Sequence, residues 1–261
     1  MRQPSFFIPH GGGPCFFMED PAGIWTGMAA FLRDLPTSLP KRPGAVLVVS
    51  GHWETEGFAF TGAERPSLLY DYYNFPPHTY ELRYDAPGAP ALAARAAGLL
   101  RDAGFVATVD PERGLDHGVF IPLKVALPDA AIPVVEMSVD RALDPAQHVA
   151  AGQALAALRD EGVLILGSGM SFHNMRGYGD PRFTAPSEAF DAWLDAAVSR
   201  PGPERAAALS NWEGAPAARI AHPKAEHLLP LMVAAGAADG PGTRVYHENV
   251  LKTAISGFRF D

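Results

Sequence analysis

The sequence lacks the features that mark secreted, membrane and nucleic-acid-binding proteins. Its single cysteine, Cys15, excludes a disulfide within the chain, and its first residues lack the basic-then-apolar pattern of a signal peptide. No apolar run approaches the ~20 residues needed to span a bilayer. The formal net charge is -8, and no cluster of Lys and Arg suits a phosphate backbone. We therefore expect a cytoplasmic protein that acts on a small molecule, with no nucleic-acid or membrane partner. Monomer and homo-oligomer both remain open.

No composition boundary divides the chain. Its 261 residues are 48% hydrophobic, enough for one large core, and its prolines and glycines are dispersed between apolar runs as turns. No Ser/Gly-rich or charge-dense segment resembles a linker. We predict a single domain over residues 1–261.

Short apolar runs rich in β-branched residues predict buried strands. They occupy residues 5–8, 45–49, 105–109, 132–137, 163–166, 243–246 and 255–260. Segments with helical spacing lie at residues 90–103, 146–160, 185–199 and 203–209. This alternation predicts an α/β fold with a central, mostly parallel mixed sheet and helices on both faces. Ligands of such sheets bind beyond the carboxyl ends of the strands.

Three of the predicted strands lead into a histidine flanked by small residues. These histidines are His10, His52 and His173. Imidazole is a common ligand of Zn, Fe and Cu, and glycines beside it let backbone and ligand approach closely. We therefore predict that the three side chains converge on one metal site at the carboxyl ends of the strands.

A fourth candidate lies in residues 221–230. Pro223 suits the first position of a helix, and His222 suits its cap. On such a helix, Glu226 and His227 point about 100° apart, so only one of them should face the site. We favour His227. Glu226 is the alternative, because a carboxylate would complete the two-His-one-carboxylate triad of oxygen-activating Fe(II) enzymes.

The remaining histidines divide into one candidate and three without a functional setting. His117 lies in a glycine-bracketed turn and is a candidate acid/base group. For His78, His148 and His247 we expect surface or structural roles. Cys15 is expected to be a small buried residue beside the first loop.

These motifs, in this order, resemble the DOPA 4,5-extradiol dioxygenases, which belong to the LigB-like class III extradiol ring-cleavage dioxygenase superfamily. The motifs lie at residues 10–14, 50–53, 115–118, 167–174 and 222–231, with an aromatic segment at 70–76 followed by 80–88. The resemblance runs from about residue 5 to the C-terminus.

The resemblance implies a mononuclear non-haem metal site. It implies His10 and His52 as ligands, with the third ligand at His227 or the adjacent Glu226. His173 matches the catalytic histidine of the superfamily, which also joins the metal in zinc-occupied relatives. His117 matches a second active-site histidine, positioned to hydrogen-bond the substrate hydroxyl or the reacting oxygen. The implied metals are Fe(2+) for dioxygenase activity and Zn(2+) as an alternative occupant, and the implied substrates are O2 and a catechol such as DOPA.

Two other functions remain open from the sequence. A zinc hydrolase could use three of the histidines with Glu54 or Glu136 to activate water, although no HExxH helix is present. A non-catalytic metal-binding protein is the second alternative, because Memo-like proteins resemble the same superfamily without cleaving rings.

Overall fold

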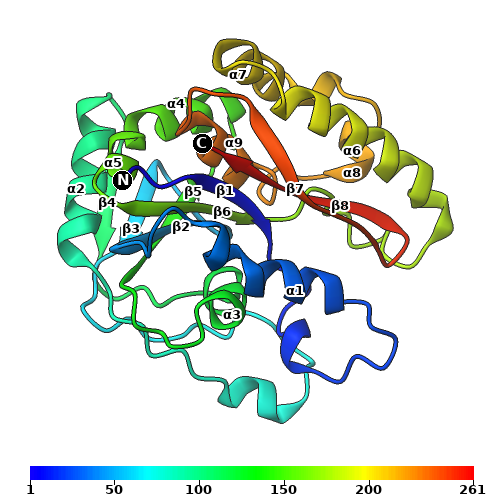
Figure 1. Cartoon of the computed structure of the whole chain (residues 1–261), viewed down its shortest axis with the longest axis horizontal. Helices are drawn as coiled ribbons and strands as arrows, with labels where there is room; N and C mark the ends of the chain where they lie inside the picture. Colours follow the sequence, from blue (N-terminus) through cyan, green and yellow to red (C-terminus); the bar gives the residue numbers. More distant parts are fainter.

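An eight-stranded mixed sheet runs through the protein, in the strand order β4-β3-β5-β2-β6-β1-β8-β7 (Figure 1). The computed structural model describes residues 1–261. The strands are β1 (Ser5–Pro9), β2 (Ala45–Thr55), β3 (Phe58–Thr61), β4 (Ala107–Asp110), β5 (Val134–Asp140), β6 (Val163–Gly169), β7 (Gly242–Val250) and β8 (Thr253–Phe260). The four central strands, β5, β2, β6 and β1, are parallel, whereas β3 is antiparallel to β5, and β8 to β1. The carboxyl ends of the central strands therefore meet at one edge.

Helices cover both faces of the sheet, with α1 and α3 on one side and α4, α6, α7 and α9 on the other (Figure 1). The helices are α1 (Thr26–Asp34), α2 (Pro90–Asp102), α3 (His117–Ala126), α4 (Pro145–Leu155), α5 (Ala157–Asp160), α6 (Thr184–Val198), α7 (Gly202–Ser210), α8 (Ala218–Ala221) and α9 (Leu229–Gly236). Short 3-10 helices are η1 (Cys15–Phe17), η2 (Leu35–Ser38), η3 (Pro77–Glu81), η4 (Pro181–Phe183) and η5 (Trp212–Gly214). No helix combines the length and the apolar character needed to cross a membrane.

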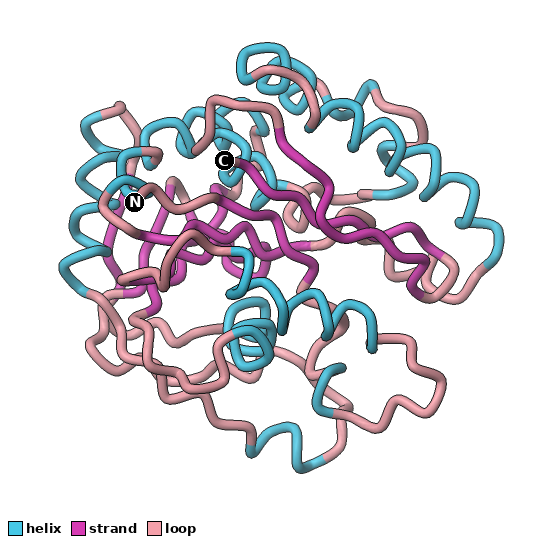
Figure 2. The backbone as a smooth tube through the Cα atoms, in the orientation of Figure 1, coloured by secondary structure: helices cyan, strands magenta, loops and turns pink.

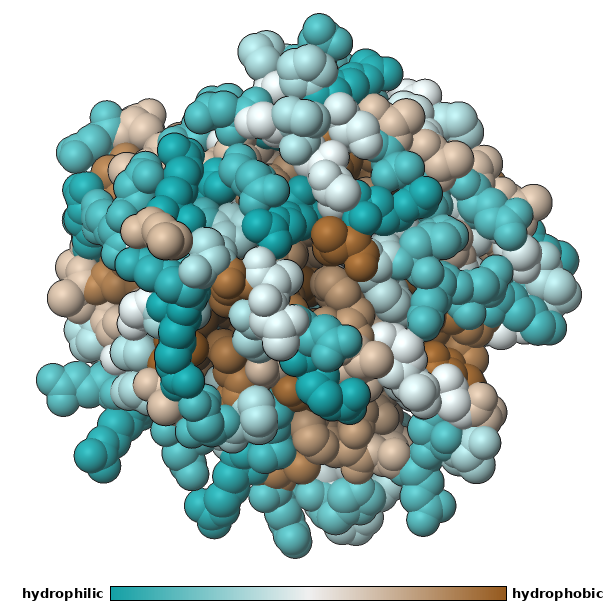
Figure 3. Space-filling model, in the orientation of Figure 1, coloured by the Kyte–Doolittle hydropathy of each residue, from teal (hydrophilic) through white to brown (hydrophobic).

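Side chains that alternate between the two faces of the sheet form two hydrophobic cores. On β2, Leu47 and Val49 belong to the larger core, while Val46 and Val48 belong to the smaller one. Successive side chains of a strand point to opposite faces, so a continuous apolar run serves both cores at once. The face shown in Figure 3 is largely hydrophilic, and hydrophobic side chains show mainly in the hollow at its centre.

The predicted fold class is confirmed, and each predicted strand occurs with bounds shifted by a few residues. The single helix predicted at residues 146–160 is divided into α4 and α5. Strand β3 and helices α1, α3, α8 and α9 were not predicted. Helix α9 is buried along its whole length, so it lacks the polar face that gives a helix its sequence period. The segment between β3 and α2 is mostly loop (Figure 2).

The helix predicted to begin at Pro223 does not form. Residues 223–228 make bends and turns, and α9 begins only at Leu229, with Pro230 in its first turn. The carbonyl of His227 accepts a hydrogen bond from the Met170 N–H at 3.1 Å, just beyond β6. The backbone of this segment is therefore held by β6 rather than by a helix of its own. His222 is not an N-cap: it ends α8, is buried, and has its Nε2 2.9 Å from the Ser171 carbonyl oxygen.

Candidate metal centre

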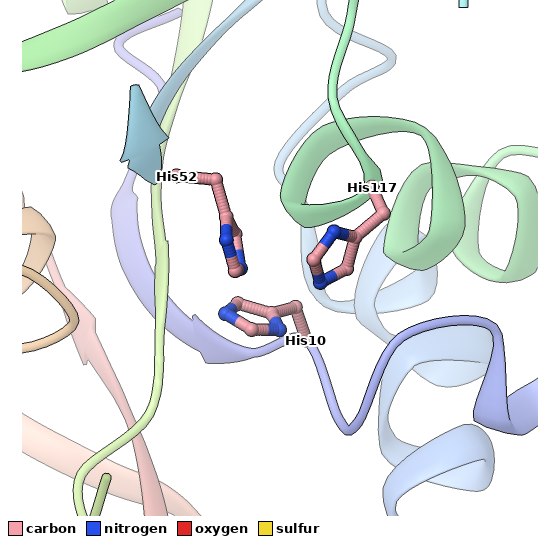
Figure 4. Close-up of side chains that lie close together, drawn as sticks. All are labelled: His10, His52 and His117. Carbon is pink, nitrogen blue, oxygen red and sulfur yellow. The ribbon is translucent and has the colours of Figure 1, made fainter. Parts of the chain in front are cut away.

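The five predicted histidines approach one point from five parts of the chain. His10 directly follows β1, and His52 lies in an irregular stretch of β2, where pairing with β5 jumps from Val49 to Glu54. Bulges of this kind re-aim side chains near active sites. His117 is the first residue of α3, and Figure 4 shows its ring facing those of His10 and His52.

The histidine rings are close enough to share one ion. One nitrogen from each of His10, His52 and His117 lies within 4.8 Å of the others, and His173, Glu226 and His227 form a second such group. The two groups adjoin, because His227 Nε2 is 3.2 Å from His52 Nε2. Two nitrogens that each lie about 2.0–2.1 Å from one ion adopt a separation of this size.

His10 carries a buried nitrogen that has no partner in the protein. Its Nδ1 lies 2.9 Å from the Gly11 carbonyl oxygen, to which it donates when that nitrogen carries the proton. Its Nε2 is then the acceptor, and it is buried without a hydrogen-bond partner. Buried polar atoms are nearly always paired, so this nitrogen fits a metal ligand.

Glu226 and His227 both adjoin the centre, but only His227 lines its cavity. Glu226 Oε1 lies 3.0 Å from His227 Nδ1 and 3.3 Å from His173 Nδ1. The rings of His173 and His227 are stacked, with centroids 3.4 Å apart. The two residues lie in a turn and not on the predicted helix. In this turn Glu226 holds the Nδ1 side of His227, and the Nε2 side faces His52.

Asp71 is a site residue that the sequence reasoning missed. Its Oδ1 accepts hydrogen bonds from the His117 N–H at 3.0 Å and from His117 Nδ1 at 2.7 Å. Its Oδ2 lies 3.7 Å from His52 Nδ1. The available signal was its position inside the aromatic segment 70–76, where it is the only charged residue. Asp71 therefore fixes the ring of His117.

Burial keeps the candidate ligands neutral. Desolvation, followed by the neighbouring histidines, lowers the pKa of His10 and His227 well below 6.5, and it lowers the pKa of His52 to about 4. Neutral imidazole is the form that binds metal. Burial would raise the pKa of Asp71, but hydrogen bonds from His117 outweigh it and the pKa is lowered. Asp71 therefore remains a carboxylate.

A buried polar network supports the His52 and His117 segments. Ser50 Oγ accepts from the His52 N–H at 3.2 Å and donates to Asp116 Oδ1 at 2.9 Å. The Asp116 N–H donates to Glu136 Oε2 at 2.9 Å. Burial, and then the charge of Asp116, raises the pKa of Glu136 well above 4.5.

Neither carboxylate considered for a zinc hydrolase lies at the centre. Glu136 belongs to the buried network, and Glu54 pairs with Lys224. Neither lines the cavity beside the histidines. The candidate centre therefore does not support the hypothesis that Glu54 or Glu136 activates water in a zinc hydrolase.

That cavity has a volume of ≈ 430 Å³. All five candidate histidines line it, together with Gly11, Gly12, Gly13, Trp25, Asp71, Tyr72, Tyr73, Phe75, Met170, Met175, Tyr178 and Leu251. Its wall thus combines metal-binding groups with aromatic and aliphatic side chains, as ligand pockets commonly do. The aromatic segment 70–76 supplies part of this wall.

The other histidines and the cysteine lie outside the centre. His148 is buried, with its Nε2 3.0 Å from the Asp140 N–H that donates to it, so its role is structural. His78 is exposed, and His247 Nδ1 lies 3.1 Å from Ser256 Oγ. Cys15 is buried and free, and burial raises the pKa of its thiol to about 12.

Comparisons with known proteins point to one family. Residues 6–258 match the family model described as the catalytic LigB subunit of aromatic ring-opening dioxygenase. The chain is 40% identical over 240 residues to a 4,5-DOPA dioxygenase extradiol of Beta vulgaris, covering 90% of this chain and 86% of the relative. It is 37% identical to the protein of that name from Escherichia coli K12, over 92% and 86% of the two chains. A dioxygenase, tasH, of Hapsidospora irregularis is 39% identical, over 90% and 78%.

A solved structure agrees with the fold over the whole chain. It is the crystal structure of an uncharacterized protein from Escherichia coli K12, with a TM-score of 0.79, 32% sequence identity and 100% coverage of both chains. The similarity therefore includes the sheet and every segment that carries a candidate site residue.

Proposed function

Because the chain belongs to the family of catalytic LigB subunits of aromatic ring-opening dioxygenases, we propose that it opens a catechol ring by extradiol cleavage with O2. The chain is an oxidoreductase of the ring-opening dioxygenase class. The observation that carries the proposal for this site is the approach of His10, His52 and His227 to one point, with His173 and His117 beside it.

The residues present fit a single metal ion. The unpaired Nε2 of His10, together with the Nε2 atoms of His52 and His227, would hold it, and His173 could join them. When bound, Fe(2+) supplies the redox chemistry that lets O2 react with the ring. A histidine-rich site also takes Zn(2+) more tightly than Fe(2+), so a purified sample can carry zinc.

His173 is suited to move a proton. Its Nδ1 lies against the Glu226 carboxylate, which leaves Nε2 as the acceptor for a phenolic proton of the substrate. The carboxylate would stabilise the charge that His173 gains, as in other pairs of histidine and carboxylate. Release of the same proton later in the reaction would return His173 to its neutral form.

His117 is suited to hold the substrate. With its Nδ1 bonded to Asp71, its Nε2 can accept a hydrogen bond from a catechol hydroxyl. The aromatic side chains of the cavity would stack on the ring and exclude water. Several relatives are named for activity on DOPA, so we propose a substituted catechol with DOPA as the reference compound.

The test uses metal-free protein loaded anaerobically with Fe(2+), followed by DOPA or a panel of other catechols and then air. We expect oxygen uptake matched by a yellow semialdehyde product, and none with Zn(2+)-loaded protein. His173→Ala should lower the rate by roughly 10²–10⁴-fold while Fe(2+) content is retained, because loss of a general base costs about this much. No oxygen uptake with any catechol would contradict the proposal.

We further propose that the protein acts in the cytoplasm on a small catechol and O2, without a nucleic-acid or membrane partner. The single, buried cysteine and the net charge of -8 support this proposal.

A further inference from the structure

We infer that the preferred catechol carries an uncharged, apolar substituent rather than the charged side chain of DOPA. The inference rests on the proposed ring cleavage and narrows its substrate class. It follows from what lines the cavity away from the histidines, where a substituent on the ring would lie.

That part of the cavity is apolar. Its walls are formed by Trp25, Phe75, Met170, Met175 and Leu251, with the tyrosines of the same cavity. The hydroxyls of two of these tyrosines are already used, because Tyr72 donates to the Thr79 carbonyl at 2.5 Å and Tyr178 donates to the Phe172 carbonyl at 2.7 Å. These two residues therefore offer a ligand mainly their rings.

No cation lines the cavity. Its charged lining residue is Asp71, and Glu226 contacts two of its histidines, so the local carboxylates would repel an anionic ligand. Arg176 and Lys252 follow the lining residues Met175 and Leu251 in the sequence, but both are exposed and neither lines the cavity.

Two other basic side chains near the site are engaged elsewhere. Arg113 pairs with Asp116 at 3.3 Å and with Glu136 at 3.6 Å, and Lys224 pairs with Glu54. The carboxylate of DOPA would therefore lose water in this cavity without gaining a basic side chain as a partner. Unpaired charge is costly to bury, and each factor of ten in selectivity requires only about 1.4 kcal/mol.

The cavity has room for a substituent. Its volume of ≈ 430 Å³ exceeds the roughly 150 Å³ of an apolar cavity that accepts one benzene molecule. A catechol ring at the histidines therefore leaves space for a substituent against apolar lining residues such as Trp25, Phe75 and Leu251. An alkyl or aryl group there would bury apolar surface against these side chains.

The test compares four catechols of similar length on the Fe(2+)-loaded enzyme: 4-propylcatechol, dopamine, 3,4-dihydroxyphenylpropanoate and DOPA. We expect kcat/KM for 4-propylcatechol to exceed that for DOPA and for the propanoate by roughly tenfold or more. A preference for DOPA or the propanoate would overturn the inference and point to the backbone amides of Gly11–Gly13 as a carboxylate site. A preference for dopamine would also overturn it, in favour of an aromatic cage for a cation.

A matched pair of variants tests whether the missing cation sets the selectivity. Met175 lines the cavity and is 71% exposed, so a longer side chain can be accommodated there. Met175→Arg should shift the kcat/KM ratio toward the propanoate by roughly tenfold relative to 4-propylcatechol, and the uncharged Met175→Gln should not. Equal shifts in both variants would show that charge is not the determinant.

A binding measurement separates this inference from the proposed reaction. Trp25 lies in the cavity, so its fluorescence should report ligands bound to the Zn(2+)-loaded protein, with Trp25→Phe as the control for the other tryptophans. Tighter binding of 4-propylcatechol than of DOPA, without turnover by the Fe(2+) form, would support the apolar site and contradict ring cleavage. Turnover by the Fe(2+) form together with tighter binding of DOPA would support ring cleavage and contradict the apolar site.

Discussion

Two carboxylates hold the Nδ1 side of three of the candidate histidines. Glu226 contacts His173 and His227, and Asp71 contacts His117. Partners of this kind orient a ring and set which nitrogen is free for a metal or a substrate. At the scale of single residues, the two carboxylates are therefore the groups to change.

Glu226→Gln and His227→Gln distinguish the two candidates for the third ligand. If His227 is the ligand, Glu226→Gln should weaken Zn(2+) binding by roughly 10–100-fold, whereas His227→Gln should weaken it much further. Competition against a chromophoric chelator measures both affinities. Retention of zinc by His227→Gln together with its loss from Glu226→Gln would identify Glu226 as the ligand instead.

Asp71→Asn tests the orientation of His117. The amide keeps the shape of the side chain but not its charge, and a charge-assisted hydrogen bond is about twice as strong as a neutral one. We expect kcat to fall by roughly tenfold or more with metal content unchanged. The measurement is steady-state oxygen uptake per mole of bound Fe(2+). A fall in the amount of folded protein with normal kcat would reduce Asp71 to a structural role.

At the scale of elements, the turn that carries Glu226 and His227 is packed directly against strand backbones. A Cβ atom on Gly51 would lie 2.8 Å from the Glu226 carbonyl oxygen and 3.2 Å from His227 Cα. A Cβ atom on Gly169 would lie 2.1 Å from the His227 carbonyl oxygen. Gly51 within β2 and Gly169 at the end of β6 therefore set the position of His227.

Gly51→Ala should displace this turn and weaken metal binding. Overpacking of this kind costs about 1–3 kcal/mol, so a fall in Zn(2+) affinity of roughly tenfold or more is expected. Gly98→Ala is the matched control, because a Cβ atom at this position of α2 meets nothing within 4 Å. Isothermal titration of both variants with Zn(2+) measures the difference. Equal affinities would show that the turn tolerates the added methyl group.

At the scale of the whole molecule, buried neutral histidines link stability to pH. His222 is fully buried outside the cavity, and burial lowers its pKa from 6.5 to about 4. Between these two values the unfolded chain binds the proton more readily than the folded protein does. The contribution of His222 is therefore complete above pH 6.5 and is lost as the pH falls toward about 4.

His222→Gln should reduce this loss by up to about 3 kcal/mol, because an amide can still donate to the Ser171 carbonyl but does not titrate. Urea unfolding of the metal-free protein between pH 7 and pH 4 gives the free energy of unfolding for parent and variant. His78→Gln, at an exposed position, is the control. If parent and His222→Gln show the same pH dependence, the titration of His222 does not cause the loss of stability at low pH.

The sequence by itself determined the α/β class, the sheet and the strands that lead into His10, His52 and His173. These features follow from the spacing of hydrophobic residues and from residues adjacent in the chain, so they can be predicted without knowledge of the fold. The family resemblance was equally visible, because its motifs are short and ordered along the chain.

Only the tertiary structure decided the roles available to Glu226 and Asp71 and the character of the cavity. Glu226 depends on a turn that is held by backbone contacts with β6, and Asp71 reaches His117 across 46 positions of the chain. No cation lines the cavity, and the nearby Arg113 and Lys224 pair with carboxylates outside it. Such long-range contacts are set by the packing of separate elements, and neither propensity nor periodicity encodes them locally.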